Sequence, residues 1–452
     1  MRPLRGQFYK AIPPARRMSK TFLEVLPMHK AEICKKIIQS IKQYLDSPDC
    51  LAAHRSHNHF IRKRKLSLKQ VAMYLLYSSK ASMYQNLATI LEELGSEVFP
   101  NVTKQAVSKA RSGILPSLFL ELFNLSIDQF YKNIGTRKTW HGYHVFAIDG
   151  SKLQLPRSKS NFDEFIEMFS THGPDRKFSM ALASMVYDVL DDYIIHASIN
   201  PYLASERQAA LNHLKTIENL GIYENSIVVF DRGYYSEWFF RYCAEHNHPC
   251  VMRLKEKIKI AKASHGDTVT TLPGDPKGGT DDIQIRVIAV PLESGETEYL
   301  ATNVFDQTMT TEMFKELYFL RWPVECKYHE LKYRINLEEF NGATSNSIRQ
   351  EFFINLLISN LASLIKNDAD ERIDASANPG NKYRYQANRT FIIGRVKKLF
   401  PKILAGIFDI SKIDQVLDEA VKRKSQIQPG RKQKRRRIDA RLKHFKNMKT
   451  TI

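Results

Sequence analysis

The sequence of 452 residues lacks the long apolar runs that mark membrane proteins. It contains no stretch of 18 apolar residues, and the most apolar segment, near 353–365, is interrupted by Asn355 and Asn360. A membrane-spanning helix is therefore not expected. The basic N-terminal residues 1–17 also lack the apolar middle of a secretory signal, so a loose basic arm is the simpler interpretation.

Cysteine is scarce, with five residues scattered along the chain. This number and spacing exclude a disulfide framework and suit a reducing compartment. Cys243, His246, His248 and Cys250 form a compact group that invites a zinc assignment. Their spacing matches no common zinc module, and a helix end leading into a strand is the alternative interpretation.

Acidic residues are too few to balance the basic ones. The chain has 68 Lys and Arg against 48 Asp and Glu, a net charge of +20. This excess favours a polyanionic partner, either nucleic acid or an acidic membrane surface. Residues 431–446 hold nine Lys or Arg against one Asp, as is typical of a disordered tail that binds anions loosely.

The first third of the chain has helical periodicity over 31–45, 67–79 and 83–94. Thr103 is a candidate N-cap for a short helix that carries Lys104 and Arg111. A helix, a glycine-containing connection and a basic second helix predict a helix-turn-helix that binds DNA. An ordinary structural helix pair is the alternative.

From about residue 139 the pattern changes to short strands. Strands are expected at 144–148, 178–190, 193–200, 226–230 and 250–254, and helices at 205–220, with Ser205 as a candidate N-cap, and at 237–246. The first three strands predict an antiparallel meander. Alternating residues in 255–306 (258–260, 268–272, 283–290, 299–303) predict an inserted β-domain, after which helices return at 306–332, 345–366 and 383–399.

Two aspartates follow expected strands. Asp149 comes after 144–148 and Asp231 after 226–230. The element order resembles the ribonuclease-H-like fold, which implies that these strands are parallel neighbours about 4.8 Å apart. Asp188, Asp191 and Asp192 would then lie at the far end of the sheet as turn residues.

The third candidate acid lies in a helix with two cations and a phenol. Tyr318, Arg321, Glu325 and Lys332 occupy a stripe about 60° wide on an ideal helix. An exposed helix with surface ion pairs is the alternative. Pro323 removes a helical amide, so a kink or a helix restart is expected there.

Three carboxylates at one place require a cation, because like charges repel strongly at short range. A site of carboxylate oxygens selects Mg²⁺ or Mn²⁺. Two such ions, bound by Asp149, Asp231 and Glu325, would activate an attacking oxygen and stabilise a leaving one.

The Y-x2-R-x3-E-x6-K spacing resembles the DDE transposases of insertion sequence family four. The similarity runs from about residue 102 to 400 and includes IDGSKLQLP at Asp149 and VVFDRGYYS at Asp231. It implies a cut-and-paste enzyme that cleaves the ends of an insertion sequence and joins them to target DNA. It also implies that Tyr318, Arg321 and Lys332 hold backbone phosphates. The resemblance further implies a homodimer bound to double-stranded DNA, in the bacterial cytoplasm and associated with the nucleoid.

One feature departs from that family. Some relatives stack a flipped base on a tryptophan of the inserted domain, but the tryptophans here are Trp140, Trp238 and Trp322. Processing through a DNA hairpin is therefore in doubt. Trp322, beside Arg321, is a candidate for base stacking or for the packed core.

The predicted organisation has five parts: a helical DNA-binding region (1–138), the first part of an α/β core (139–254), an all-β insertion (255–306), the second part of the core with the catalytic helix (307–400), and a helical segment with the basic tail (401–452). Two other functions remain open: a transposase-derived protein that binds DNA without catalysis, and a metal-dependent nuclease of the same fold.

Overall fold

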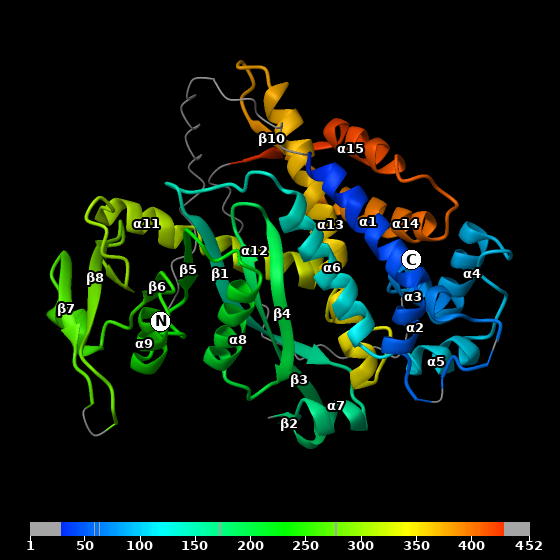
Figure 1. Cartoon of the computed structure of the whole chain (residues 1–452), viewed down its shortest axis with the longest axis horizontal. Helices are drawn as coiled ribbons and strands as arrows, with labels where there is room; N and C mark the ends of the chain where they lie inside the picture. The colour runs from blue at the N-terminus through cyan, green and yellow to red at the C-terminus, as the bar shows by residue number, and fades with distance from the viewer. Residues whose placement is uncertain (1–28, 58, 63, 171–172, 276–277, 429–452) are drawn as a thin grey trace. The chain divides into compact units, whose positions relative to one another are not determined.

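The computed structural model describes residues 29–57, 59–62, 64–170, 173–275 and 278–428 (Figure 1). The chain divides into two compact units, residues 1–136 with 357–452 and residues 137–356. The predicted basic arm and basic tail lie outside the described residues. Within the described ranges, no helix has both the length and the apolar character needed to cross a bilayer. The five-part functional division stays a prediction.

The first unit is helical. Its described elements are α1 (Lys30–Asp46), α2 (Pro48–His54), α3 (Leu68–Tyr77), α4 (Met83–Leu94), α5 (Lys104–Ser112), α6 (Ser117–Asn133), the end of α13 (Ser345–Ala375), α14 (Arg389–Leu404), α15 (Lys412–Lys422) and the hairpin of β10 (Arg384–Ala387) with β11 (Lys424–Ile427). Helix α1 packs beside α6 (Figure 1), and α14 packs on α3.

Local sequence signals place several helix starts correctly in this unit. The Thr103 hydroxyl accepts a hydrogen bond from the Ala106 amide, so the predicted N-cap of α5 is confirmed. The helix predicted from residue 383 starts later, at Arg389. The reason is that residues 384–387 pair with β11, and pairing with a distant strand overrides the local preference.

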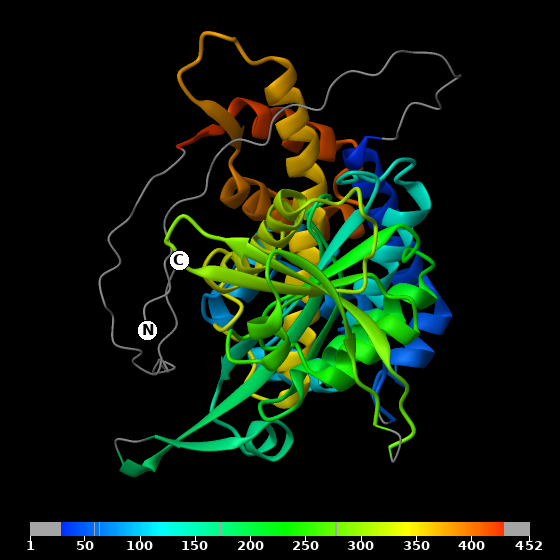
Figure 2. The ribbon, with the colours of Figure 1, turned by 90° about the vertical axis from the view of Figure 1, so that its left-hand side faces the viewer.

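The second unit contains one mixed sheet of nine described strands (Figure 2). The strands are β1 (His144–Leu155), β2 (Glu167–Ser170), β3 (Gly173–Asp188), β4 (Tyr193–Pro201), β5 (Ser226–Phe230), β6 (Cys250–Arg253), β7 (Asp267–Leu272), β8 (Ile283–Pro291) and β9 (Thr297–Thr302). They follow the order β2-β3-β1-β5-β6-β9-β8-β7, with β4 paired to β3. The helices are α7 (Lys159–Glu164), α8 (Glu206–Asn219), α9 (Glu237–Glu245), α10 (Lys259–Ala263), α11 (Thr311–Phe319), α12 (Trp322–Tyr333) and the start of α13.

The strand pairing confirms the predicted meander. Strand β1 pairs antiparallel with β3, β3 pairs antiparallel with β4, and β5 lies beside β1 in parallel. The predicted end of the first strand at residue 148 is wrong, because β1 continues to Leu155. It continues because β3 supplies hydrogen-bonding partners through Leu155↔Ser179, whereas the Asp-Gly-Ser sequence suggested a turn.

The inserted residues extend the sheet of the second unit. Strand β9 pairs with β6, and β8 and β7 follow outward. The prediction of a strand at 258–260 is wrong, and with it the all-β description of the insertion, because residues 259–263 form α10. Lysine and alanine, which make up most of KIAKA, favour helix when no neighbouring strand pairs with the segment.

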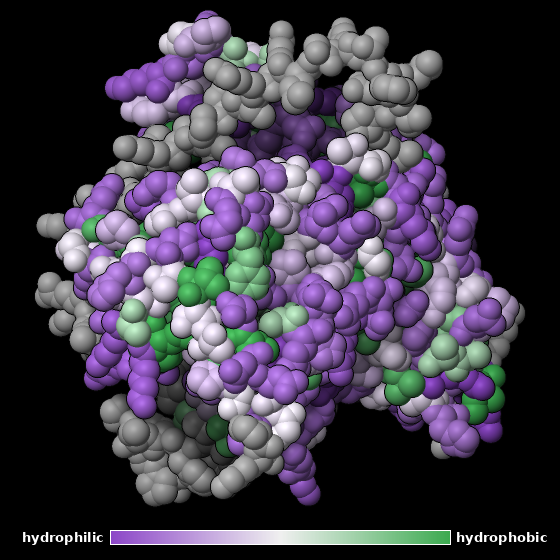
Figure 3. Space-filling view, turned by 60° about the vertical axis from the view of Figure 1, so that its left-hand side comes forward, coloured by the Kyte–Doolittle hydropathy of each residue, from purple (hydrophilic) through white to green (hydrophobic). Residues whose placement is uncertain are grey.

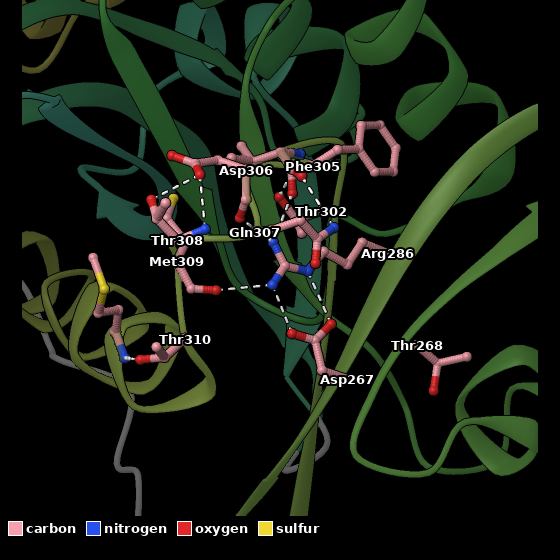
Figure 4. A network of polar contacts seen from close by, with 12 residues as sticks. Asp267, Thr268, Arg286, Thr302, Phe305, Asp306, Gln307, Thr308, Met309 and Thr310 are labelled. Carbon is pink, nitrogen blue, oxygen red and sulfur yellow. Dashed lines mark hydrogen bonds and ion pairs between the residues drawn. The ribbon is translucent and has the colours of Figure 1, made fainter.

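Arg286 of β8 joins the inserted strands to the segment that leads into α11 (Figure 4). Its guanidinium is buried, forms an ion pair with Asp267 at 2.6 Å, and donates to the carbonyl oxygens of Asp306 and Met309 at 2.7 and 2.8 Å. A buried guanidinium with this many acceptors orders the chain around it. The insertion thereby supports the start of α11.

A hydrophobic cluster covers one face of this sheet. It includes Val145 of β1, Ile227 and Val229 of β5, and Leu317 and Tyr318 of α11. Because successive side chains of a strand alternate between faces, Asp149 is on the same face of β1 as Val145. The same alternation directs Asp231 toward this face from the end of β5.

Candidate active site

The two candidate aspartates lie immediately beyond the parallel pairing of β1 and β5. The last paired residues are Ile148 and Phe230, so Asp149 and Asp231 are the next residues on two neighbouring strands. Asp231 ends its strand, whereas Asp149 still pairs with β3 opposite Met185. The sheet therefore carries both carboxylates to one edge of the cluster that α11 covers.

Glu325 comes to this place on α12, which starts after a break. Helix α11 ends at Phe319 and α12 begins at Trp322, so the helix restart expected at Pro323 is confirmed. Proline is tolerated in the first turn of a helix because the amides there have no partner within the helix. Glu325 lies in the first turn of α12, with 28% of its side chain exposed.

Arg321 and Tyr318 lie among the three acids. The Arg321 Nη2 atom is 2.7 Å from Glu325 Oε1, and the Tyr318 hydroxyl donates to Asp231 Oδ1 at 3.2 Å. The Arg321 guanidinium lies over the Tyr318 ring, 5.7 Å from its centroid. The break in the helix thus leaves Tyr318, Arg321 and Glu325 together, although they no longer share one continuous helix.

The charges of these groups act on one another. The pKa of Asp149 is raised to about 7, chiefly by burial, with further upward contributions from Asp231 and Glu325. Arg321 and the Gly150 amide oppose that shift. Such mutual influence between carboxylates is expected only of groups that share a small, poorly hydrated volume.

Arg321 has hydrogen-bonding capacity that the described residues leave unused. It is only 7% exposed, and within the described part of the chain its Nε and Nη1 atoms have no hydrogen-bond partner. Burial opposes its charge, but Tyr318, Asp231 and Glu325 raise its pKa above the ordinary value. A buried guanidinium with two unused donors is suited to an anion that brings several acceptor oxygens.

The other predicted DNA contacts have varied surroundings. Lys332 Nζ donates to the Lys152 carbonyl at 2.7 Å, and Trp322 is half-buried. In the first unit, Lys104 lies over the exposed Tyr84 ring, whereas Arg111 is buried, with 5% exposed. Their roles in binding DNA stay predictions.

The carboxylates fit a hard metal ion in donor type but are not yet arranged as ligands. Among the described residues, no group of three or more His, Cys, Asp or Glu could hold a metal ion. This finding does not support the zinc alternative at Cys243, His246, His248 and Cys250. At the acidic site, Glu325 is paired with Arg321, so a metal ion would have to replace that partner.

Two residues at the start of α8 support the site and were missed from the sequence. Arg207 donates to the carbonyl oxygens of Gly233 and Tyr234, both at 2.9 Å, and so holds the loop after Asp231. Glu206 lies beside Gly150, where a Cβ atom would be 3.4 Å from Glu206 Oε1. The predicted N-cap Ser205, which is confirmed, marks this helix start but gives no hint of what it approaches.

Residues 140–361 match the family model described as the transposase DDE domain. The match includes Asp149, Asp231 and Glu325. A protein named "Putative transposase InsZ" from Escherichia coli K12 is 28% identical over 140 residues, which cover 30% of this chain and 44% of that protein. The two similarities support a DDE transposase. The chain spans less than half the length of this curated relative.

A solved structure, of piggyBac transposase in a synaptic complex with hairpin DNA, is also similar. Its TM-score is 0.45 at 10% identity, covering 87% of this chain and 85% of that chain. At this level the similarity does not establish a shared fold in detail.

Proposed function

We propose that this protein is a DNA transposase with a ribonuclease-H-like core that cuts the ends of an insertion sequence and joins them to target DNA. The observation that carries the proposal is the convergence of Asp149, Asp231 and Glu325, from two strands and one helix, around Arg321. The match to the transposase DDE domain supports the same interpretation. The fine assignment to insertion sequence family four rests on the spacing of Tyr318, Arg321, Glu325 and Lys332.

In this proposal Asp149, Asp231 and Glu325 hold Mg²⁺ or Mn²⁺. Their oxygen atoms are the donors that these ions prefer. A bound metal ion would lower the pKa of the attacking hydroxyl group and stabilise the departing oxygen of the phosphodiester. Burial of Asp149 beside other acids makes its charge costly, and a cation would remove that cost.

Arg321 is assigned to the DNA backbone. Its Nε and Nη1 atoms are buried and have no acceptor among the described residues, and a phosphate supplies acceptors in the planar geometry that a guanidinium matches. Tyr318 holds Asp231, while Lys332 lies at the other end of α12. Trp322 is half-buried beside Arg321 and is assigned to base stacking.

The remaining surface suits a nucleic-acid partner. The net charge of +20 favours phosphate binding that weakens with salt. Hydrophilic residues predominate on the face shown in Figure 3, with hydrophobic residues in smaller areas. Lys104 and Arg111 of the predicted helix-turn-helix, the homodimer on DNA and the cytoplasmic, nucleoid-associated location belong to the proposal.

The test uses the full chain and a labelled duplex made from the DNA on either side of its gene, where the proposal expects short inverted repeats. With Mg²⁺, the proposal expects metal-dependent cleavage at the repeat ends followed by joining to a second duplex. Cleavage without joining would instead indicate a nuclease. Specific binding with neither reaction would indicate a transposase-derived binding protein. The variant Asp149→Asn is the matched control in each assay.

A further inference from the structure

Tyr328 lies one helical turn beyond Glu325 on α12 and is almost completely buried, at 6% exposed. Its hydroxyl is within hydrogen-bonding distance of two main-chain carbonyl oxygens, that of Asp149 at 3.0 Å and that of Ala183 at 3.2 Å. The first belongs to β1 and the second to β3. A single hydroxyl hydrogen is thus shared between carbonyl groups of two neighbouring strands, one of which carries Asp149.

A second polar contact runs parallel to the first. Four residues after Tyr328, Lys332 donates to the Lys152 carbonyl, three residues after Asp149 on β1. One helical turn on α12 therefore corresponds to three residues on β1, and each position is joined by a hydrogen bond to the main chain. These two contacts, together with the ion pair of Lys327 with Asp192 at 2.7 Å, hold α12 against the sheet.

Apolar packing alone would specify this placement poorly. The buried residues of α12 are Val324, Lys327, Tyr328, Glu330 and Leu331, so two of the five are charged. Apolar contacts are non-directional, whereas a hydrogen bond to a carbonyl requires a defined distance and angle. Directional contacts from Tyr328 and Lys332 are what this helix offers in place of a continuous apolar stripe.

We infer that Tyr328 is a positioning residue that sets Glu325 at its working distance from Asp149. Its hydroxyl donates to the main-chain carbonyl of Asp149, and Glu325 lies three residues earlier on the same helix. Tyr328 itself contacts neither DNA nor metal. This inference rests on the proposed function, because the three acids that Tyr328 would keep in position are the ones proposed to bind the metal.

The variant Tyr328→Phe tests the inference, because it keeps the ring and removes only the hydroxyl. We expect the rate of cleavage to fall about 10- to 100-fold, since a displacement of about 1 Å in a catalytic group has effects of that order. The Mn²⁺ concentration for half-maximal rate should rise, because the acids must be brought together by the metal instead. Affinity for the duplex should stay near that of the wild type.

Tyr187→Phe is the matched control. Tyr187 is also buried in the second unit, and its hydroxyl donates to Asp192, a turn residue, rather than to the site. Tyr328→Phe loses a hydroxyl shared between two carbonyl oxygens and Tyr187→Phe loses a hydrogen bond to a carboxylate, so both variants should lose thermal stability. Only Tyr328→Phe should shift the dependence on Mn²⁺. Equal rates and equal metal dependence in the two variants would overturn the positioning role.

Mn²⁺ binding followed by electron paramagnetic resonance separates the two proposals. A wild type that neither cleaves nor binds Mn²⁺ overturns the proposed function and the role of Tyr328 together. A wild type that binds Mn²⁺ while Tyr328→Phe binds it equally tightly overturns only the role of Tyr328. If Tyr328→Phe does not fold, Lys332→Met removes the parallel contact and should weaken Mn²⁺ binding in the same direction.

Discussion

The second unit contains two groups of three acids, and the groups that contact their carboxylates differ. The turn group, Asp188, Asp191 and Asp192, closes the connection between β3 and β4. The site group, Asp149, Asp231 and Glu325, gathers around Arg321. Asp188 pairs with Phe146, three residues before Asp149 on β1, so the pair of β1 and β3 carries one acid of each group.

The turn group is satisfied by its own chain and by one lysine. The Asp188 carboxylate accepts from the Asp191 amide at 3.1 Å, Asp191 accepts from the Lys138 amide at 3.3 Å, and Lys327 lies 2.7 Å from Asp192. The first two contacts are with main-chain amides, as is usual for turns, and the third is an ion pair with a lysine of α12. The buried acids of this group therefore have a structural role in the turn.

In the site group, side chains hold two of the acids, since Tyr318 donates to Asp231 and Arg321 pairs with Glu325, and the neighbouring acids raise the pKa of Asp149. Asp149 accepts from one amide, that of Gly150, and its pKa is raised by burial and by two neighbouring carboxylates. Burial alone therefore does not separate functional acids from structural ones. The identity of the neighbouring groups does, because amide donors stabilise a carboxylate through hydrogen bonds, whereas neighbouring acids destabilise its charge and favour binding of a cation.

The largest expected effect comes from exchanging acids for amides in both groups. Asp149→Asn, Asp231→Asn and Glu325→Gln should each abolish cleavage and joining while DNA binding stays near normal, because each removes a proposed metal ligand. Asp191→Asn should keep cleavage but unfold at a lower temperature, because a buried carboxylate with main-chain donors is replaced. Loss of cleavage in Asp191→Asn, with its melting temperature unchanged, would contradict the distinction between the groups.

The pH dependence of stability should report on Asp149 of the site group. Because the pKa of Asp149 is higher when folded (about 7) than when unfolded (near 3.8), its contribution is full at low pH and is lost as the pH rises from about 4 to 7. Asp149→Asn should therefore match the wild type near pH 4 and exceed it at pH 8 by up to about 4 kcal/mol.

Denaturant unfolding of both proteins between pH 4 and 8, without metal, measures this difference. Addition of Mg²⁺ at pH 8 should stabilise the wild type more than Asp149→Asn, since only the wild type has the full set of ligands. A constant difference between the two proteins at every pH would show that Asp149 is not the group responsible.

A smaller effect is expected when the cation of the site group is removed. Arg321→Gln should bind Mn²⁺ about tenfold more tightly in the absence of DNA, because Glu325 is released and a repelling charge is lost. Arg253→Gln is the control, since it breaks a neighbouring ion pair, with Glu298 at 3.0 Å, that involves none of the three acids. Equal Mn²⁺ affinities for both variants, measured by calorimetry, would argue against competition between Arg321 and the metal.

The smallest effect distinguishes two lysines of α12. Lys332→Ala should weaken DNA binding and reduce the logarithmic dependence on salt by about 0.9, the value for one phosphate contact. Lys327→Ala should leave that slope unchanged and lower the melting temperature, because Lys327 is buried and serves the turn group. Fluorescence anisotropy across a salt series gives both slopes. An identical slope for wild type and Lys332→Ala would confine Lys332 to its contact with Lys152.

Sequence patterns were most reliable where the deciding interaction is local. Ser205 and Thr103 were found as N-caps because a side chain bonds an amide three residues away. The restart at Pro323 follows from its missing amide. Asp149, Asp231 and Glu325 are proposed from motifs; the structure places Asp149 and Asp231 just beyond the pairing of neighbouring strands and pairs Glu325 with Arg321, and their catalytic role stays a prediction.

Patterns failed where distant residues decide. The length of β1 depends on β3, and α10 forms where an alternating sequence suggested a strand. Arg207 and Tyr328 could not be singled out, because each acts on carbonyl groups far away in the sequence, at residues 233–235 and at Asp149. The periodicity of a sequence does not show which main-chain oxygen a side chain will bind.

The sequence by itself determined the helical first region, the alternation of strands and helices that follows, and the set of acids available for a metal site. These depend on residue type and spacing along the chain. Only the tertiary structure decided that Arg321 pairs with Glu325, that Asp188 and Asp191 accept hydrogen bonds from amides, and that Tyr328 donates to the main-chain carbonyl of Asp149. The physical reason is that a buried charge is stabilised by groups within a few ångströms of it. Residues far apart in the sequence come that close only when the strands and helices have packed together.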